Sequence, residues 1–233
     1  MNSAPNSRTA LVARIREAMP GSALLFLRFG ECTVEVNANE EEVIADLKRY
    51  FSPFVIESGS AAIMVSVHQS PEYHLPVEYS LKPPDPGKTK IKEEFYEMAD
   101  GRVVRKRLTG MLFVFGGGEN VAVGPCLENL NQVVNFINNR YIEWLLCRGC
   151  LLGHAAGVVV DGRGLAMAGF SGAGKSTLAL HLMNKGATFV SNDRLMIAPD
   201  NSGLEMHGVA KMPRINPGTA LNNPYLRKIM RIE

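Results

Sequence analysis

The eight residues from Gly169 to Ser176 constrain the fold of this chain more than any other feature of its sequence. They read Gly-Phe-Ser-Gly-Ala-Gly-Lys-Ser and fit the phosphate-binding pattern G-x-x-x-x-G-K-[ST]. The pattern is meaningful only where a strand leads into the loop and a helix leads out of it. The apolar run 165–168 before the loop and the helical pattern 175–185 after it predict this strand–loop–helix context.

The residue types in this loop are those that phosphate binding requires. Glycines let the backbone turn tightly and aim successive N–H groups at phosphate oxygens, and the helix N-terminus adds its dipole. The Lys175 ammonium can reach the β- and γ-phosphates, and the Ser176 hydroxyl can bind Mg²⁺. Thr177 fits an ordinary first turn of the helix. The sequence therefore predicts that a nucleoside triphosphate and Mg²⁺ are held by Gly169, Ser171, Gly172, Ala173, Gly174, Lys175, Ser176 and Thr177.

Two polar residues near this loop are further candidates for the site. Asp193 follows the apolar run 189–190, where a ligand of Mg²⁺ or a catalytic base often lies one strand after the loop. The alternative for the same residue is a turn or the cap of a helix. His154 opens the strand predicted over 154–160, where it is either part of the site or a structural residue. Asn192 either contributes to metal binding or shapes the turn.

The first 146 residues contain no evident catalytic constellation. Their periodicity predicts a small α+β domain with helices over 9–19 and 127–146 and strands over 22–29, 32–36 and 61–68. Asn39 and Glu42 fit a capping box that starts another helix. Asp100-Gly101 is typical of a type I′ turn between two strands of a hairpin.

Composition excludes several classes of protein without choosing a function. The chain has 233 residues, 46% of them hydrophobic, and a formal net charge of +2, which fits a globular protein with no nucleic-acid partner. Its longest stretch without Asp, Glu, Lys or Arg spans the 14 residues 58–71, fewer than the roughly 20 that a membrane helix needs. We therefore expect no membrane partner. The four cysteines are too few for a disulfide scaffold, and we expect a cytoplasmic protein. Homo-oligomer formation stays open.

At these residues the sequence resembles HPr kinase/phosphorylase, and more closely the bacterial HPr kinase-related kinases of the B type. The resemblance covers about residues 152–226 and rests on ordered blocks at 153–158, 169–180, 185–187, 190–193 and 208–219. It implies a phosphoryl-transfer fold with a twisted sheet, related to that of phosphoenolpyruvate carboxykinase. It also implies that ATP and Mg²⁺ serve to phosphorylate a hydroxyl.

The resemblance also implies roles for individual residues. The three catalytic residues would be His154, Lys175 and Asp193. His154 would lie near the transferred phosphate. Asp193 would accept the proton of the acceptor hydroxyl or would hold Mg²⁺ together with Ser176. Arg214, which follows Pro213 in the last block, is the candidate for substrate contact.

The chain departs from the family pattern at two places. Asn192 stands where the family has the first aspartate of a Val-Ala-Asp-Asp block, and the C-terminal signature that engages HPr is not seen. We therefore expect the acceptor to be a protein or small molecule other than HPr. The alternative is a nucleotide-binding regulatory protein, a Mg-ATP switch with little or no catalysis.

The expected fold class is α/β. An N-terminal α+β domain over residues 1–146, for substrate recognition or assembly, precedes an HPr kinase/PEP carboxykinase-like P-loop kinase domain over residues 147–233. Because the loop lies late in the chain, we expect this kinase domain to be shortened or incomplete at its C-terminus. The Cys147-x-x-Cys150 pair has no further ligands at zinc-site spacing, so incidental thiols are favoured over metal or redox use.

Overall fold

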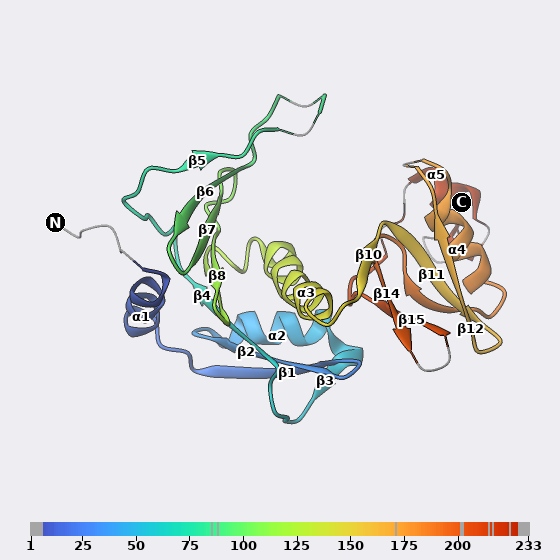
Figure 1. Ribbon diagram of the computed structural model, residues 1–233, viewed down its shortest axis with the longest axis horizontal. Helices are drawn as coiled ribbons and strands as arrows, with labels where there is room; N and C mark the ends of the chain where they lie inside the picture. Colours follow the sequence, from blue (N-terminus) through green and yellow to red (C-terminus); the bar gives the residue numbers. More distant parts are fainter. Residues whose placement is uncertain are drawn as a thin grey trace. The chain divides into compact units, whose positions relative to one another are not determined.

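The chain forms two compact units in a computed structural model that describes residues 7–84, 86–87, 89–170, 172–200, 203–213, 215, 217–223 and 225–227. Unit 1 comprises Met1–Arg140 and unit 2 comprises Tyr141–Glu233 (Figure 1). The protein is a mixed α/β protein with a large mixed sheet and several helices, as its sequence predicted at that level. The division between the units falls inside helix α3 (Leu130–Leu146).

Unit 1 is built on a nine-stranded sheet with strand order β3-β1-β2-β4-β9-β8-β7-β6-β5. Strand β4 is parallel to its neighbours β2 and β9, and the other pairs are antiparallel. The strands are β1 (Ala23–Phe29), β2 (Cys32–Ala38), β3 (Val55–Ile56), β4 (Ile63–Gln69), β5 (Ser80–Leu81), β6 (Glu93–Met98), β7 (Gly101–Lys106), β8 (Leu112–Gly116) and β9 (Glu119–Gly124). The helices are α1 (Arg8–Ala18), α2 (Glu41–Tyr50), the short 3₁₀ helix η1 (Ser52–Phe54) and α3.

Strand β8 shows how the sheet of unit 1 is covered on both faces. Leu112 and Val114 lie in a buried cluster with Leu11 of α1, whereas the ring of Phe113 lies 4.8 Å from that of Phe136 in α3. Because neighbouring side chains of a strand point to opposite faces, α1 and α3 cover opposite faces of the sheet at β8. Helix α2 packs against β1 and β2. It lies in the connection between β2 and the parallel strand β4.

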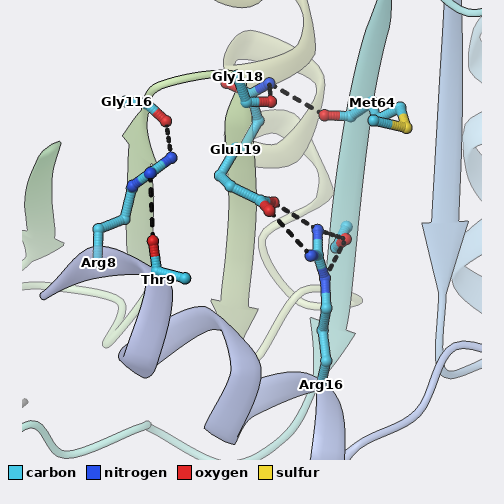
Figure 2. A network of polar contacts seen from close by, with 9 residues as sticks. Arg8, Thr9, Arg16, Met64, Gly116, Gly118 and Glu119 are labelled. Carbon is cyan, nitrogen blue, oxygen red and sulfur yellow. Dashed lines mark hydrogen bonds and ion pairs between the residues drawn. The ribbon is translucent and has the colours of Figure 1, made fainter. Parts of the chain in front are cut away.

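Two arginines of α1 tie the helix to three central strands of its sheet (Figure 2). Arg8 donates to the Gly116 carbonyl, and Arg16 donates to the Glu119 carboxylate at 2.7 Å and to the Ser66 hydroxyl at 3.1 Å. These bonds join the first and the last turns of α1 to β4, β8 and β9.

The predicted capping box at Asn39 is wrong. The residue that caps α2 is Glu40, and its side chain makes no capping hydrogen bond. The Asn39 amide instead donates to the Gln69 carbonyl at 3.0 Å and accepts from the Gln69 N–H at 2.7 Å. It therefore joins the ends of the parallel strands β2 and β4, and a contact over 30 residues replaces the local one.

The predicted type I′ turn at Asp100-Gly101 is also wrong. Met98 pairs with Gly101, so the two-residue loop is Ala99-Asp100, and neither residue has a positive φ. The Asp100 carboxylate accepts from the Arg8 N–H at 2.8 Å, at the start of α1. A Cβ on Gly101 would lie 2.7 Å from the Phe115 carbonyl, so close strand packing requires glycine there.

Unit 2 contains two three-stranded antiparallel sheets, with strand orders β12-β11-β13 and β10-β14-β15. Strands β3 and β10 and helix α5 were not predicted from the sequence. The elements of unit 2 are β10 (Leu151–Gly153), β11 (Ala155–Val160), β12 (Arg163–Ala168), α4 (Lys175–Met183), β13 (Thr188–Ser191), β14 (Leu195–Asp200), β15 (Gly203–Gly208) and α5 (Pro217–Asn222).

Strand β11 is the centre of unit 2. Ala156 and Val158 form a buried cluster with Ala179 of α4. Gly157, which points to the other face, leaves room for Leu195 of β14, because a Cβ on Gly157 would lie 2.7 Å from that side chain. Helix α4 and the second sheet therefore lie on opposite faces of β11.

Candidate functional site

The predicted strand–loop–helix context of the phosphate-binding pattern is present. Strand β12 ends at Ala168 and α4 begins at Lys175, so residues 169–174 form the connecting loop. Gly172 and Gly174 have φ values of 84° and 83°, a left-handed conformation that favours glycine. A Cβ at either position would meet no atom within 4 Å. The glycines are therefore required by backbone conformation, and the space beside them is open to a ligand.

The Lys175 ammonium lies over this loop. It donates to the carbonyl oxygens of Gly169 at 2.7 Å and Phe170 at 3.1 Å. The Ala173 N–H donates to the Phe170 carbonyl at 3.2 Å and so closes a turn within the loop. A bound phosphate would offer the lysine charged acceptors in place of two carbonyl groups, and charged hydrogen bonds are the stronger ones.

Strand pairing brings the remaining candidates to the same edge of the sheet. Ala155 at the start of β11 pairs with Ala168 at the end of β12, and Gly157 pairs with Ser191 at the end of β13. His154 directly precedes β11, and Asp193 follows β13 by two residues. The phosphate-binding loop and these two residues therefore meet at one end of three neighbouring strands.

His154 and Asp193 contact each other directly. The His154 Nδ1 lies 3.1 Å from Asp193 Oδ1, and the two side chains are 63% and 47% exposed, so both remain accessible to a ligand. The Ser191 hydroxyl donates to the Arg194 carbonyl at 2.6 Å and shapes the turn that carries Asp193. Beside this turn, the Ser176 hydroxyl donates to the Asn192 carbonyl at 3.2 Å.

The loop, His154 and Asp193 line one cavity of about 730 Å³ within unit 2, a volume typical of small-molecule sites. From the sequence-predicted set, its lining contains His154, Gly172, Gly174, Lys175, Ser176, Thr177 and Asp193. Asn192 lines it as well. Gly169 and Ala173, which were also predicted, are described but do not belong to this lining. Ser171 and Arg214, the remaining predicted contacts, lie outside the described residues.

The cavity also has a wall that the site prediction omitted. It is formed by residues 30 to 50 positions after the loop, and their only signal in the sequence was their place in the last family-like block. Thr219 is the clearest example, since its hydroxyl lies 2.9 Å from that of Thr177. Lys211 adds a positive charge to the lining. The other residues of this wall are Met212, Ile215 and Gly218.

The oxygen atoms in this cavity fit a magnesium ion better than a transition metal. The described part of the chain contains no cluster of three or more His, Cys, Asp or Glu side chains arranged to hold a metal. Mg²⁺ is typically bound through one or two protein oxygens, with phosphate oxygens and water completing its shell. The Ser176 hydroxyl and the Asp193 carboxylate supply such oxygens in one lining.

The Cys147-x-x-Cys150 pair consists of two free thiols, of which Cys147 is exposed and Cys150 is buried. Across the described residues, no helix combines the length and the apolar character needed to cross a membrane. Comparison with protein-family models and with curated proteins returned no match for the chain.

Proposed function

We propose that unit 2 binds ATP with Mg²⁺ and transfers its γ-phosphoryl group to a hydroxyl of a protein or small-molecule acceptor, in the manner of HPr kinase-related kinases. One observation carries the proposal: Lys175 and Ser176 of the phosphate-binding loop line the same cavity as the His154–Asp193 pair. Phosphate binding and proton transfer need these two sets of groups within reach of one ligand.

Each group has a role that follows from its chemistry. The N–H groups of the loop and of the first turn of α4 would hold the phosphates, and the Lys175 ammonium would neutralise charge that develops during transfer. Mg²⁺ would supply further charge neutralisation, held by Ser176 and Asp193. The Asp193 carboxylate would orient the acceptor hydroxyl or accept its proton, and His154 would hold that carboxylate in place.

The acceptor and the cellular setting belong to the same proposal. The acceptor hydroxyl would approach the exposed side chains of His154 and Asp193. Arg214 is the substrate contact that the family resemblance implies. The described cysteines form no disulfide, which supports a reducing cytoplasm as the place of action.

The first test uses the full chain, γ-labelled ATP, Mg²⁺ and a bacterial lysate as the source of acceptors. We expect Lys175→Ala to lower labelling by at least about a hundredfold, the typical loss for a group that stabilises developing charge. Its thermal unfolding should match that of the parent chain, because only two bonds to loop carbonyls are lost. The control is Lys185→Ala, which removes an exposed lysine after α4. Labelling by Lys175→Ala at the parent level would contradict the assignment.

A second candidate is a Mg-ATP switch without transfer, which Asn192 favours. Its backbone carbonyl accepts from the Ser176 hydroxyl. Its side chain is an amide where the family pattern has a carboxylate, so one of the two carboxylates of that pattern is missing. Asp193→Ala separates the two functions, because a kinase would lose acceptor labelling in this variant. Tight binding of Mg-ATP by the parent chain, with neither turnover nor transfer, would support the switch.

A further inference from the structure

The segment around α5 forms one wall of the cavity, and its described residues contact α4 near both ends of that helix. Near the phosphate-binding loop, the hydroxyls of Thr177 and Thr219 lie 2.9 Å apart. At the other end of α4, the Asn184 amide donates to Asn223 Oδ1 at 3.2 Å. The segment from Thr219 to Asn223 is therefore fastened to both ends of α4.

Asn223 anchors this segment firmly. Its side chain is 1% exposed, and its Oδ1 also accepts the N–H groups of Tyr225 at 3.0 Å and Leu226 at 3.3 Å. An oxygen that accepts three hydrogen bonds fixes the chain on either side of it. Thr219, one turn before Asn223, is thereby placed against the third residue of α4.

The two hydroxyls of Thr177 and Thr219 carry two protons, and the hydrogen bond between them uses only one. Each hydroxyl can donate one hydrogen bond and can accept two. Thr177 and Thr219 share one proton between them, whichever of the two donates, and the second proton remains. Both residues line the cavity, beside Lys175 and Ser176. A phosphate oxygen is the acceptor that this remaining proton suits best, because hydrogen bonds to charged groups are the stronger ones.

We propose that Thr219 is a positioning residue for the nucleotide: its hydroxyl fixes that of Thr177, so that the pair donates one hydrogen bond to a phosphate oxygen of the bound ATP. This inference rests on the proposed function and extends the site to a residue 42 positions after Thr177. It makes the affinity for ATP depend on a segment outside the sequence pattern of the loop.

The test measures binding of Mg-ATP to the full chain by calorimetry, together with the KM and kcat of transfer. Thr219→Val removes the hydroxyl and keeps the shape of the side chain. We expect it to weaken Mg-ATP binding about tenfold, as for one hydrogen bond to a charged group, and to raise KM with little change in kcat. Thr219→Ser should restore the affinity, because it restores the hydroxyl.

A double-mutant cycle shows whether the two threonines act as one unit. The variant with both Thr177→Val and Thr219→Val should bind Mg-ATP no more weakly than Thr177→Val alone. The matched control is Thr188→Val in β13, an exposed threonine outside the cavity, which should bind like the parent chain.

The outcomes separate this inference from the proposed function. If the parent chain binds Mg-ATP and Thr219→Val binds it equally well, the inference is wrong and the proposed function stands. The inference is also wrong if Thr219→Ser is as weak as Thr219→Val, because shape rather than the hydroxyl would then matter. If the parent chain binds no Mg-ATP, the proposed function fails and the inference fails with it.

Discussion

His68 on β4 is an ionisable residue that the interior of unit 1 holds in its neutral form. Its side chain is 2% exposed, and its Nδ1 lies 2.8 Å from the Met19 carbonyl, so Nδ1 carries the proton. Its Nε2 is buried without a hydrogen-bond partner. Burial lowers the pKa of His68 most, the charge of Arg16 lowers it further, and the bond to Met19 acts in the opposite direction. Protonation would therefore leave a buried N–H without an acceptor.

This burial predicts a pH dependence of stability. Below the ordinary pKa of 6.5, the unfolded chain binds a proton at His68 that the folded chain does not bind. The free energy of unfolding should therefore fall as the pH drops through about 6.5 and should stop falling below the lowered pKa. His68→Asn keeps a donor for Met19 but does not titrate. Denaturant unfolding between pH 8 and pH 5 should show a shallower pH dependence for this variant, and equal slopes would contradict the prediction.

At the scale of single elements, Asn39 decides how two strands end rather than how a helix begins. Its two hydrogen bonds to the backbone of Gln69 are partly buried and join β2 to β4. The sequence pattern made Glu42 its partner, but Glu42 is exposed and α2 has no side-chain cap. The two residues should therefore differ sharply in their contributions to stability.

Asn39→Ala should lower the free energy of unfolding by about 1–3 kcal/mol, because it removes two hydrogen bonds and leaves partly buried backbone groups without partners. Glu42→Ala should change it by no more than about 0.5 kcal/mol, as for an ordinary surface position. Urea unfolding of both variants with unchanged m-values would measure this difference. If Glu42→Ala lowered the free energy of unfolding as much as Asn39→Ala does, the result would contradict this prediction and support the capping box.

At the scale of the whole molecule, the described residues of the candidate site all belong to unit 2. All the residues that line the cavity lie within Tyr141–Glu233, and the nine-stranded sheet lies in unit 1. A ligand stabilises the cooperative unit that binds it. Mg-ATP is therefore expected to act on the two units unequally.

Hydrogen exchange of the full chain with and without Mg-ATP should show this inequality. We expect slower exchange in peptides that cover residues 169–180, 190–194 and 209–219, and unchanged exchange in peptides from β2, β4 and β9 of unit 1. Lys175→Ala provides the control, because it should abolish the protection in unit 2. Equal protection in both units would show that nucleotide binding involves unit 1 as well.

Local patterns predicted much of the secondary structure, and the two Asp-Gly turns show where such patterns fail. Asp161-Gly162 forms the loop between β11 and β12 with φ values of 48° and 74°, as a type I′ turn requires. The same dipeptide at Asp100-Gly101 is shifted by one residue, because the Asp100 carboxylate accepts the N–H of Arg8 at the start of α1 and Gly101 packs against the Phe115 carbonyl. The propensity is identical, and distant contacts decide the outcome.

The sequence by itself determined the phosphate-binding loop and its flanking strand and helix. These features depend on residues that are close in the sequence, so their spacing can be read from the sequence itself. Only the tertiary structure decided that His154 contacts Asp193, that Asn39 joins two strands, and that Thr219 lies against Thr177. Such pairs lie 30 to 42 residues apart, and strand order and packing, which no local pattern encodes, bring them together.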